Sequence, residues 1–204
     1  MDLRPYALAD ESGVAAWWIA SDPGELALGG ELPEEHVLGA GSASTTLAQI
    51  LVPTGTGRVL DLGTGSGVQG LIAARSAREV VATDVSSRAL GFAGFNAALN
   101  HVALDLREGS LYDPVADERF DRIVSNPPFV ITPRGSAEVP SYTYRDGGFR
   151  GDGLVEAVMR GAGDRLARGG IAQLLGNWEV HGDQDAARVP VSYTHLTLPT
   201  NREV

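Results

Sequence analysis

The sequence has no cysteine and no lysine, and histidine occurs only four times in 204 residues. Without cysteine, disulfides, thiolate nucleophiles and cysteine-ligated zinc or iron–sulfur sites are excluded. The four histidines are scattered along the chain, so no metal site is predicted. All sixteen basic residues are arginine, a bias that indicates GC-rich coding.

Long apolar runs and an amino-terminal signal pattern are also missing. No stretch of about 18 apolar residues occurs, so no membrane span is expected. The amino terminus lacks the basic, apolar and small-residue succession of a secretory signal, which makes the cytoplasm the default location. The net charge is −10. The electrostatic field of a strongly acidic chain does not attract nucleic acid, although a local basic patch is compatible with this net charge.

The composition changes at the end of the chain. Residues 192–204 contain no alanine or glycine and resemble a translated sequencing adapter, so they are interpreted as an artefactual tail. Residues 1–43 form an N-terminal segment whose Trp17-Trp18 pair is expected to pack over the core rather than to touch a substrate. Residues 44–191 are predicted to form one domain that is incomplete at its carboxyl end.

From residue 58 onward, strand and helix patterns alternate. This alternation predicts an α/β fold with a parallel sheet that helices cover on both faces. A short helix with Ser44 as a possible cap precedes the first strand. We expect strands at 58–62, 79–85, 105–111, 120–125 and 170–175, and helices at 44–52, 68–76, 86–100 and 153–168.

A glycine-rich turn follows the first of these strands. Gly63, Gly65 and Gly67 allow a tight turn and a close approach of the backbone to a ligand, and the next helix presents unpaired amides. The spacing Gly65-x-Gly67-x-x-Gly70 also matches the dinucleotide fingerprint, a weak signal by itself. The turn therefore predicts a nucleoside-bearing cofactor and leaves a nicotinamide dinucleotide open.

Two acidic residues flank this turn in the predicted sheet. Asp61 lies two residues before the first glycine, and Asp84 ends the second strand. A carboxylate at the Asp84 position can accept both hydroxyls of a ribose, a role that nicotinamide enzymes share. The alternative for Asp84 is a helix cap ahead of Ser86.

Asn126-Pro127-Pro128-Phe129 comes directly after the fourth strand of the domain. An amide or base amino nitrogen is a poor nucleophile, because its lone pair is conjugated. The Asn126 side-chain oxygen and a proline carbonyl can each accept one N–H, which orients that lone pair. The prolines stiffen the loop, and Phe129 can stack on a flat target group.

Together the glycine turn and Asn-Pro-Pro-Phe resemble the class I S-adenosylmethionine-dependent methyltransferases of the N-P-P-[FY] amino-methylating subgroup. The resemblance implies a Rossmann-like sheet with strand order 3-2-1-4-5, truncated before the family's last two strands. It implies S-adenosyl-L-methionine as cofactor, with Asp61 near the methionine part. Ser110 is the counterpart of the residue that contacts adenine, and Asp113 is its competitor. The implied cofactor-binding residues are Asp61, Gly63, Thr64, Gly65, Gly67, Asp84, Val85, Ser110, Leu111 and Asn126, and the catalytic ones are Asn126, Pro127, Pro128 and Phe129.

The stretch 142–154 resembles the HemK-type enzymes, which methylate a glutamine amide of translation release factors. This chain differs in its Gly-Gly-Phe-Arg-Gly-Asp-Gly-Leu spacing and in having Phe129 where those enzymes usually have tyrosine. The resemblance implies N-methylation of a planar nitrogen in a macromolecule, with a protein glutamine favoured. RNA or DNA base amino methylation is the first alternative, since those enzymes share the motif. A NAD-dependent Rossmann enzyme is the second.

Overall fold

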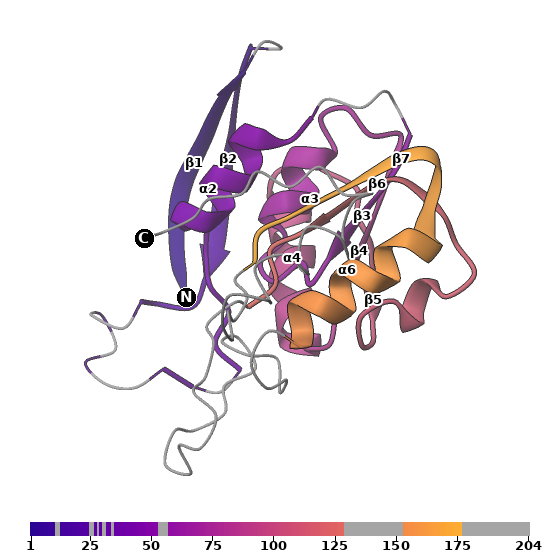
Figure 1. Cartoon of the computed structure of the whole chain (residues 1–204). Helices are drawn as coiled ribbons and strands as arrows, with labels where there is room; N and C mark the ends of the chain where they lie inside the picture. The colour runs from indigo at the N-terminus through magenta and orange to yellow at the C-terminus, as the bar shows by residue number, and fades with distance from the viewer. Residues whose placement is uncertain are drawn as a thin grey trace, which may run out of the picture.

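The computed structural model describes residues 1–10, 13–24, 27, 29, 32–33, 35–52, 57–128 and 153–176. A five-stranded sheet with flanking helices forms the body of the molecule, and a two-stranded hairpin lies against one side (Figure 1). In the described part of the chain, no helix is long and apolar enough to cross a membrane.

The five-stranded sheet has the order β5-β4-β3-β6-β7, and every neighbouring pair is parallel. This is the predicted order 3-2-1-4-5. The order reverses between β3 and β6, which opens a crevice at the carboxyl ends of these strands, where ligands bind in such sheets. The strands are β3 (Arg58–Leu62), β4 (Glu79–Asp84), β5 (Asp105–Glu108), β6 (Phe120–Ser125) and β7 (Leu166–Leu174).

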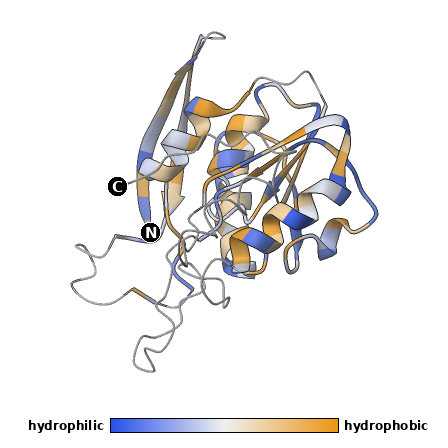
Figure 2. Cartoon of the chain, in the orientation of Figure 1, coloured by the Kyte–Doolittle hydropathy of each residue, from blue (hydrophilic) through white to orange (hydrophobic). Residues whose placement is uncertain are grey.

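Helices cover both faces of the sheet, as predicted. On one face, α6 packs its buried residues against apolar side chains of β3, β6 and β7. In Figure 2, α6 alternates hydrophobic and hydrophilic colours, as an amphipathic helix does. On the other face, α2 and α3 cover Val59, Val80 and Val124. The helices are α2 (Ser42–Ile50), α3 (Val68–Ala73), α4 (Ser87–Leu99), α6 (Gly153–Arg165) and the short 3₁₀ helix η1 (Asp113–Val115).

Several predicted boundaries were wrong. The last helix ends at Arg165 rather than at residue 168, and β7 begins at Leu166 rather than at 170. The pairing of β7 with β6 shifts register between Phe120 and Arg122, a local irregularity that the apolar pattern does not reveal. Ser44 does not cap α2: Gly41 occupies the N-cap position, and Ser44 lies inside the first turn.

The N-terminal segment contains a β-hairpin that the sequence analysis did not predict. Strand β1 (Asp2–Asp10) pairs antiparallel with β2 (Gly13–Ser21), with Tyr6 opposite Trp17. Trp17 is 7% exposed and packs with side chains of α2, α3 and α4, whereas Trp18 is 52% exposed. The prediction that the tryptophan pair packs over the core therefore holds for Trp17 and is wrong for Trp18.

Asn96 of α4 and Asn100, the C-cap of the same helix, bind backbone groups of β2 as a neighbouring strand would. Asn100 accepts the Trp18 N–H at 2.8 Å and donates to the Trp18 carbonyl at 2.8 Å. One helical turn earlier, Asn96 accepts the Ala20 N–H at 2.7 Å and donates to the carbonyls of Ala20 and Ser66, at 2.9 and 2.8 Å. The four-residue spacing of the two asparagines thus matches the two-residue spacing of Trp18 and Ala20, whose backbone groups gain partners at this edge of β2.

We predict that Asn96→Ala destabilises the fold more than Asn100→Ala does. Asn96 is fully buried, so its loss leaves one N–H and two carbonyls without partners, at about 1–3 kcal/mol for each unsatisfied group. Asn100 is partly exposed, and water replaces its contacts. Urea unfolding should show a loss of about 3 kcal/mol or more for Asn96→Ala and about 1 kcal/mol for Asn100→Ala. Equal losses would contradict the role of buried Asn96.

Candidate functional site

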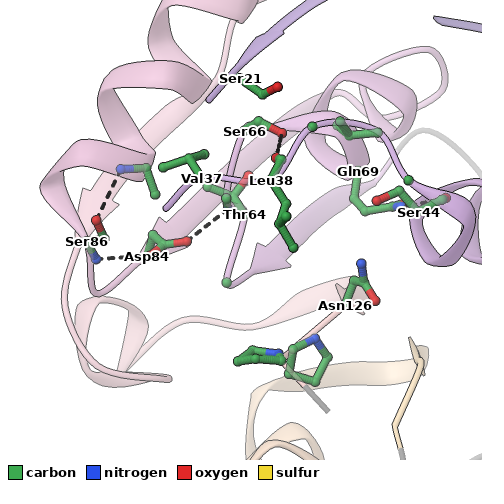
Figure 3. A pocket seen from close by; sticks show the side chains of 18 of the residues that line it. Ser21, Val37, Leu38, Ser44, Thr64, Ser66, Gln69, Asp84, Ser86 and Asn126 are labelled. Atoms are coloured by element: carbon green, nitrogen blue, oxygen red, sulfur yellow. Dashed lines mark hydrogen bonds between the residues drawn. The ribbon is translucent and has the colours of Figure 1, made fainter. Parts of the chain in front are cut away.

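A cavity of about 880 Å³ lies at the carboxyl ends of β3, β4 and β6. This is the crevice that the reversal of strand order predicts. Figure 3 shows side chains from both sides of it, with Asp84 at one end and Asn126 at the other. Its volume lies in the range of small-molecule sites. The cavity therefore brings together the glycine turn and the Asn-Pro-Pro motif, which lie about 60 residues apart in the sequence.

The glycine turn forms the floor of the cavity. Gly63 and Gly65 line it in the left-handed conformation, with φ of 69° and 55°, and a Cβ at either would meet no atom within 4 Å. The N–H groups of Gly63 and Thr64 both donate to the Thr83 carbonyl at 2.9 Å. Gly67 does not line the cavity. A Cβ there would lie 3.1 Å from the Ala93 Cα, so this glycine allows α3 to approach α4.

Asp61 lies beneath the turn rather than in the cavity wall. It is 1% exposed and accepts the Thr64 hydroxyl at 2.6 Å. Burial raises the pKa of Asp61 to about 6, while the hydrogen bonds from the Thr64 hydroxyl and the Gly70 amide act in the opposite direction. Thr64 itself lines the cavity. Asp61 thus supports the turn from below, and its predicted contact with a cofactor stays a prediction.

Asp84 lines the cavity at the end of β4. Its two oxygens accept the N–H groups of Gly65 and Ser86, each at 2.9 Å. Burial raises the pKa of Asp84 above its usual value. A carboxylate has about four acceptor positions, so acceptor capacity remains for ligand hydroxyls. The cap of α4 is Ser86, which accepts the Ala89 N–H at 3.2 Å, so Asp84 is not the cap.

Residues that follow β4 and β5 line the same end of the cavity. Ser110 and Leu111 line it beside Val85, whereas the alternative residue Asp113 does not. Leu111 has a φ of 46°, a left-handed conformation that bulky residues rarely adopt. The structure therefore places Ser110, Leu111 and Val85 in one cavity, and their contact with a cofactor stays a prediction.

Asn126, Pro127 and Pro128 line the other end of the cavity, and Phe129 lies outside the described residues. The preceding Ser125 donates its hydroxyl to the Leu62 carbonyl at 2.8 Å, which ties the end of β6 to the end of β3. The side-chain oxygen of Asn126 is buried and has no hydrogen-bond partner in the structure. Leaving a buried acceptor unpaired costs free energy, which an N–H from a ligand would recover.

Residues 36–44 form the wall that faces the glycine turn, and we call this segment the strap. The Ser66 hydroxyl donates to the Leu38 carbonyl at 2.7 Å, and the Gln69 amide donates to the Ser44 carbonyl at 2.9 Å. Sequence reasoning missed Leu38, Ser66 and Gln69 as site residues. None carries a charge or belongs to a recognised motif position, so only their contacts across the fold reveal them.

The described residues contain no group of three acidic or histidine side chains that could hold a metal ion. The lining includes four residues with carboxyl groups, Asp2, Asp22, Glu35 and Asp84, and two basic residues, Arg4 and His36, beside hydroxyl and amide groups. This donor set suits an uncharged or cationic organic ligand that carries hydroxyl and amino groups.

Comparison with known proteins agrees with this geometry. The sequence model of the methyltransferase small domain matches residues 39–140, which cover the strap from Gly39 onward, the glycine turn, Asp84 and Asn126. The chain belongs to the small methyltransferase domain family. Membership of this family favours methyl transfer over the nicotinamide alternative, whose fingerprint the glycine turn shares.

Several curated relatives carry glutamine methyltransferase names. A release factor glutamine methyltransferase of Xylella fastidiosa is 41% identical over 64% of this chain and 49% of its own. A ribosomal protein uL3 glutamine methyltransferase of Bradyrhizobium diazoefficiens is 35% identical over 79% and 53%. A putative protein N5-glutamine methyltransferase of Methanocaldococcus jannaschii is 30% identical over 65% and 68%. The chain spans about half the length of the first two relatives.

Solved structures share the fold. The T. thermophilus 16S rRNA methyltransferase in complex with AdoMet and guanosine matches with a TM-score of 0.55 and 24% identity, over 86% of this chain and 42% of that one. A methyltransferase from Pyrococcus furiosus matches with a TM-score of 0.51 and 23% identity, over 71% and 64%. At these identities the likeness concerns the Rossmann-like fold.

We predict that Asp61→Asn removes a pH dependence of stability. The folded-state pKa of Asp61 is about 6, above the ordinary value of 3.8, so the folded protein holds this proton more tightly than the unfolded chain does. Protonation of Asp61 therefore stabilises the fold at low pH. This contribution is lost as the pH rises through about 6. Between about pH 4.5 and about pH 7.5, the wild-type free energy of unfolding should fall by about 2 kcal/mol relative to Asp61→Asn. Parallel urea-unfolding profiles for the two proteins would show that burial does not perturb Asp61.

Proposed function

We propose that this chain is the S-adenosylmethionine-dependent catalytic domain of a methyltransferase that modifies the side-chain amide nitrogen of a protein glutamine. The observation that carries the proposal is the position of Asn126. This residue, with its buried and unpartnered amide oxygen, lies in the same cavity as the glycine turn and Asp84. A cofactor held at Asp84 and an acceptor nitrogen held at Asn126 would meet between them.

The residues present fit this cofactor. Asp84 keeps acceptor capacity for ribose hydroxyls after binding the amides of Gly65 and Ser86. Open space at Gly63 and Gly65 lets the backbone approach a ligand closely. Val85, Ser110 and Leu111 line the nucleoside end. When bound, S-adenosylmethionine supplies an electrophilic methyl group on a positively charged sulfur.

Asn126 acts on the acceptor nitrogen. Its amide oxygen accepts one N–H of the glutamine amide, and the carbonyl of Pro127 accepts the other. This pairing turns the nitrogen lone pair toward the methyl group and costs no reorganisation, because the two prolines stiffen the loop. The nitrogen gains the methyl group and loses one proton to solvent after transfer, so no strong base is required.

The names of the relatives support a glutamine acceptor in a protein. Their printed substrates are a release factor and ribosomal protein uL3, both parts of the translation machinery. We therefore also propose that the protein acts in the cytoplasm. The net charge of −10 gives no general attraction for RNA.

A labelled methyl-transfer assay tests the function. Total protein and total RNA fractions are incubated with the chain and with S-adenosylmethionine that carries a radioactive methyl group. We expect label in protein, released as N5-methylglutamine on peptide digestion. Label in RNA alone would show that the acceptor is a nucleic-acid base and not a protein. Failure to bind S-adenosylhomocysteine would contradict the proposal that S-adenosylmethionine is the cofactor.

We predict that Asn126→Ala abolishes methyl transfer but retains cofactor binding. Losing the acceptor that orients the amide should lower kcat about 100-fold, whereas the dissociation constant for S-adenosylhomocysteine should change less than about threefold. Rate assays and isothermal titration calorimetry on the same preparation measure the two effects. An Asn126→Ala enzyme with the wild-type rate would exclude the proposed orientation of the amide.

Asp84→Ala should show the opposite pattern. Removing a charged hydrogen-bond acceptor costs about 1.5–3 kcal/mol, so we expect S-adenosylhomocysteine to bind about 10- to 150-fold more weakly. Asp84→Asn keeps one acceptor oxygen, so its affinity for S-adenosylhomocysteine should lie between those of the wild type and Asp84→Ala. Asp113→Ala is the matched control, because Asp113 follows the same edge of the sheet but does not line the cavity. Similar losses for Asp84→Ala and Asp113→Ala would assign the effect to general charge rather than to ribose binding.

A further inference from the structure

Leu38 is a large apolar side chain that lies between two polar groups of the cavity, Asp84 and Asn126. It lines the cavity and is 54% exposed, although large apolar side chains are usually covered. In Figure 3 its side chain points into the cavity, with Asp84 on one side and Asn126 on the other. Its exposure therefore occurs inside the site rather than on the outer surface.

The backbone on both sides of Leu38 is held in place. The preceding Val37 donates its N–H to the Asp22 carboxylate at 3.0 Å and accepts the Asp22 N–H at 3.0 Å. Asp22 in turn pairs with Arg88 of α4 at 2.5 Å. The Leu38 carbonyl accepts the Ser66 hydroxyl at 2.7 Å. These contacts tie the strap both to α4 and to the glycine turn, so the backbone of Leu38 is fixed at the cavity wall.

The following residue shows how closely the strap approaches the hairpin. A Cβ at Gly39 would lie 2.8 Å from the Ser21 hydroxyl oxygen. Glycine at this position lets the strap lie against β2, which sets how far Leu38 reaches into the cavity. Ser66 and Val37 are themselves 4% exposed, so this anchoring is internal and rigid.

We propose that Leu38 is a positioning residue that packs against the cofactor between its ribose and its reacting methyl group. The inference rests on the proposed function, which puts the ribose at Asp84 and the acceptor nitrogen at Asn126. Any ligand that joins these two ends passes the Leu38 side chain. A leucine held there is covered when the ligand binds, which contributes affinity by removing apolar surface from water.

The same contact keeps water away from the site of methyl transfer. Leu38 faces the cavity from the strap, and Pro127 and Pro128 line it from the end of β6. Apolar groups on both sides of the reacting atoms leave the nitrogen of the acceptor as the nucleophile within reach. Leu38 therefore affects both cofactor affinity and the rate of transfer.

Leu38→Ala with two ligands tests the proposal. S-adenosylhomocysteine spans the cavity from Asp84 to Asn126, whereas adenosine ends at the ribose. We expect calorimetry to show S-adenosylhomocysteine binding about five- to tenfold more weakly to Leu38→Ala, with adenosine unchanged within about twofold. An equal loss of affinity for both ligands would show that Leu38 contacts the nucleoside part, which would overturn the inference.

Two control variants separate packing from stability. Leu38→Met keeps an apolar side chain of similar size and should bind S-adenosylhomocysteine as the wild type does. Phe95→Ala removes another exposed apolar side chain, 47% exposed on α4 and outside the cavity lining, and should change neither ligand. The melting temperature of Leu38→Ala should equal that of wild type, because the lost side chain is largely uncovered in the absence of ligand.

A double-mutant cycle with Ser66→Ala tests the role of the strap. If the Ser66 hydroxyl acts by holding Leu38, Ser66→Ala should weaken S-adenosylhomocysteine binding in the wild type and have a smaller effect in the Leu38→Ala background. Additive effects, or wild-type affinity in Leu38→Ala, would overturn the inference and leave the proposed function standing. Failure of the wild type to bind S-adenosylhomocysteine would instead count against the function.

Discussion

The hydrogen bond from the Ser125 hydroxyl to the Leu62 carbonyl, at 2.8 Å, marks the constraint on which the site depends. It joins the carboxyl ends of β6 and β3 at the point where the strand order reverses. The glycine turn follows the end of β3, and Asn126 follows the end of β6. Because parallel pairing holds the two ends at the same height, both motifs open into one cavity.

A second layer of contacts closes this cavity from the amino-terminal side. Asn96 joins α4 to both β2 and the Ser66 carbonyl, and the Ser66 hydroxyl holds the strap. Ser66 is therefore shared between the hairpin support and the cavity wall. Asp22 adds a link between the strap and Arg88. The hairpin, which lies outside the parallel sheet, thus helps to position the cavity wall although it contributes no recognised motif.

The chemistry of the cavity changes along its length. Asp84 provides charged acceptor positions at one end, and Asn126 provides an amide at the other. Leu38 is presented between them. In the proposed complex, the polar ends would bind the hydroxyls and N–H groups of the ligand, and Leu38 would exclude water from the reacting atoms. Asp61 contributes from beneath through Thr64, as a buried carboxyl whose pKa is raised by its surroundings.

The sequence by itself determined those elements whose pattern lies within a few neighbouring residues. The strands Arg58–Leu62 and Phe120–Ser125 were predicted to the residue, because short stretches with large apolar side chains end at glycine or at Asn-Pro-Pro. The strand order followed from the family resemblance, and Asp84 and Ser110 line the cavity, where their contact with a cofactor stays a prediction. Tertiary structure alone decided the hairpin, the irregular start of β7, and the separation of Asp61 and Gly67 from the cavity. It also decided that Leu38 faces a cavity rather than a core. An apolar residue has the same pattern in either setting, and only the distant segments that pack around it determine whether solvent, protein or ligand covers it.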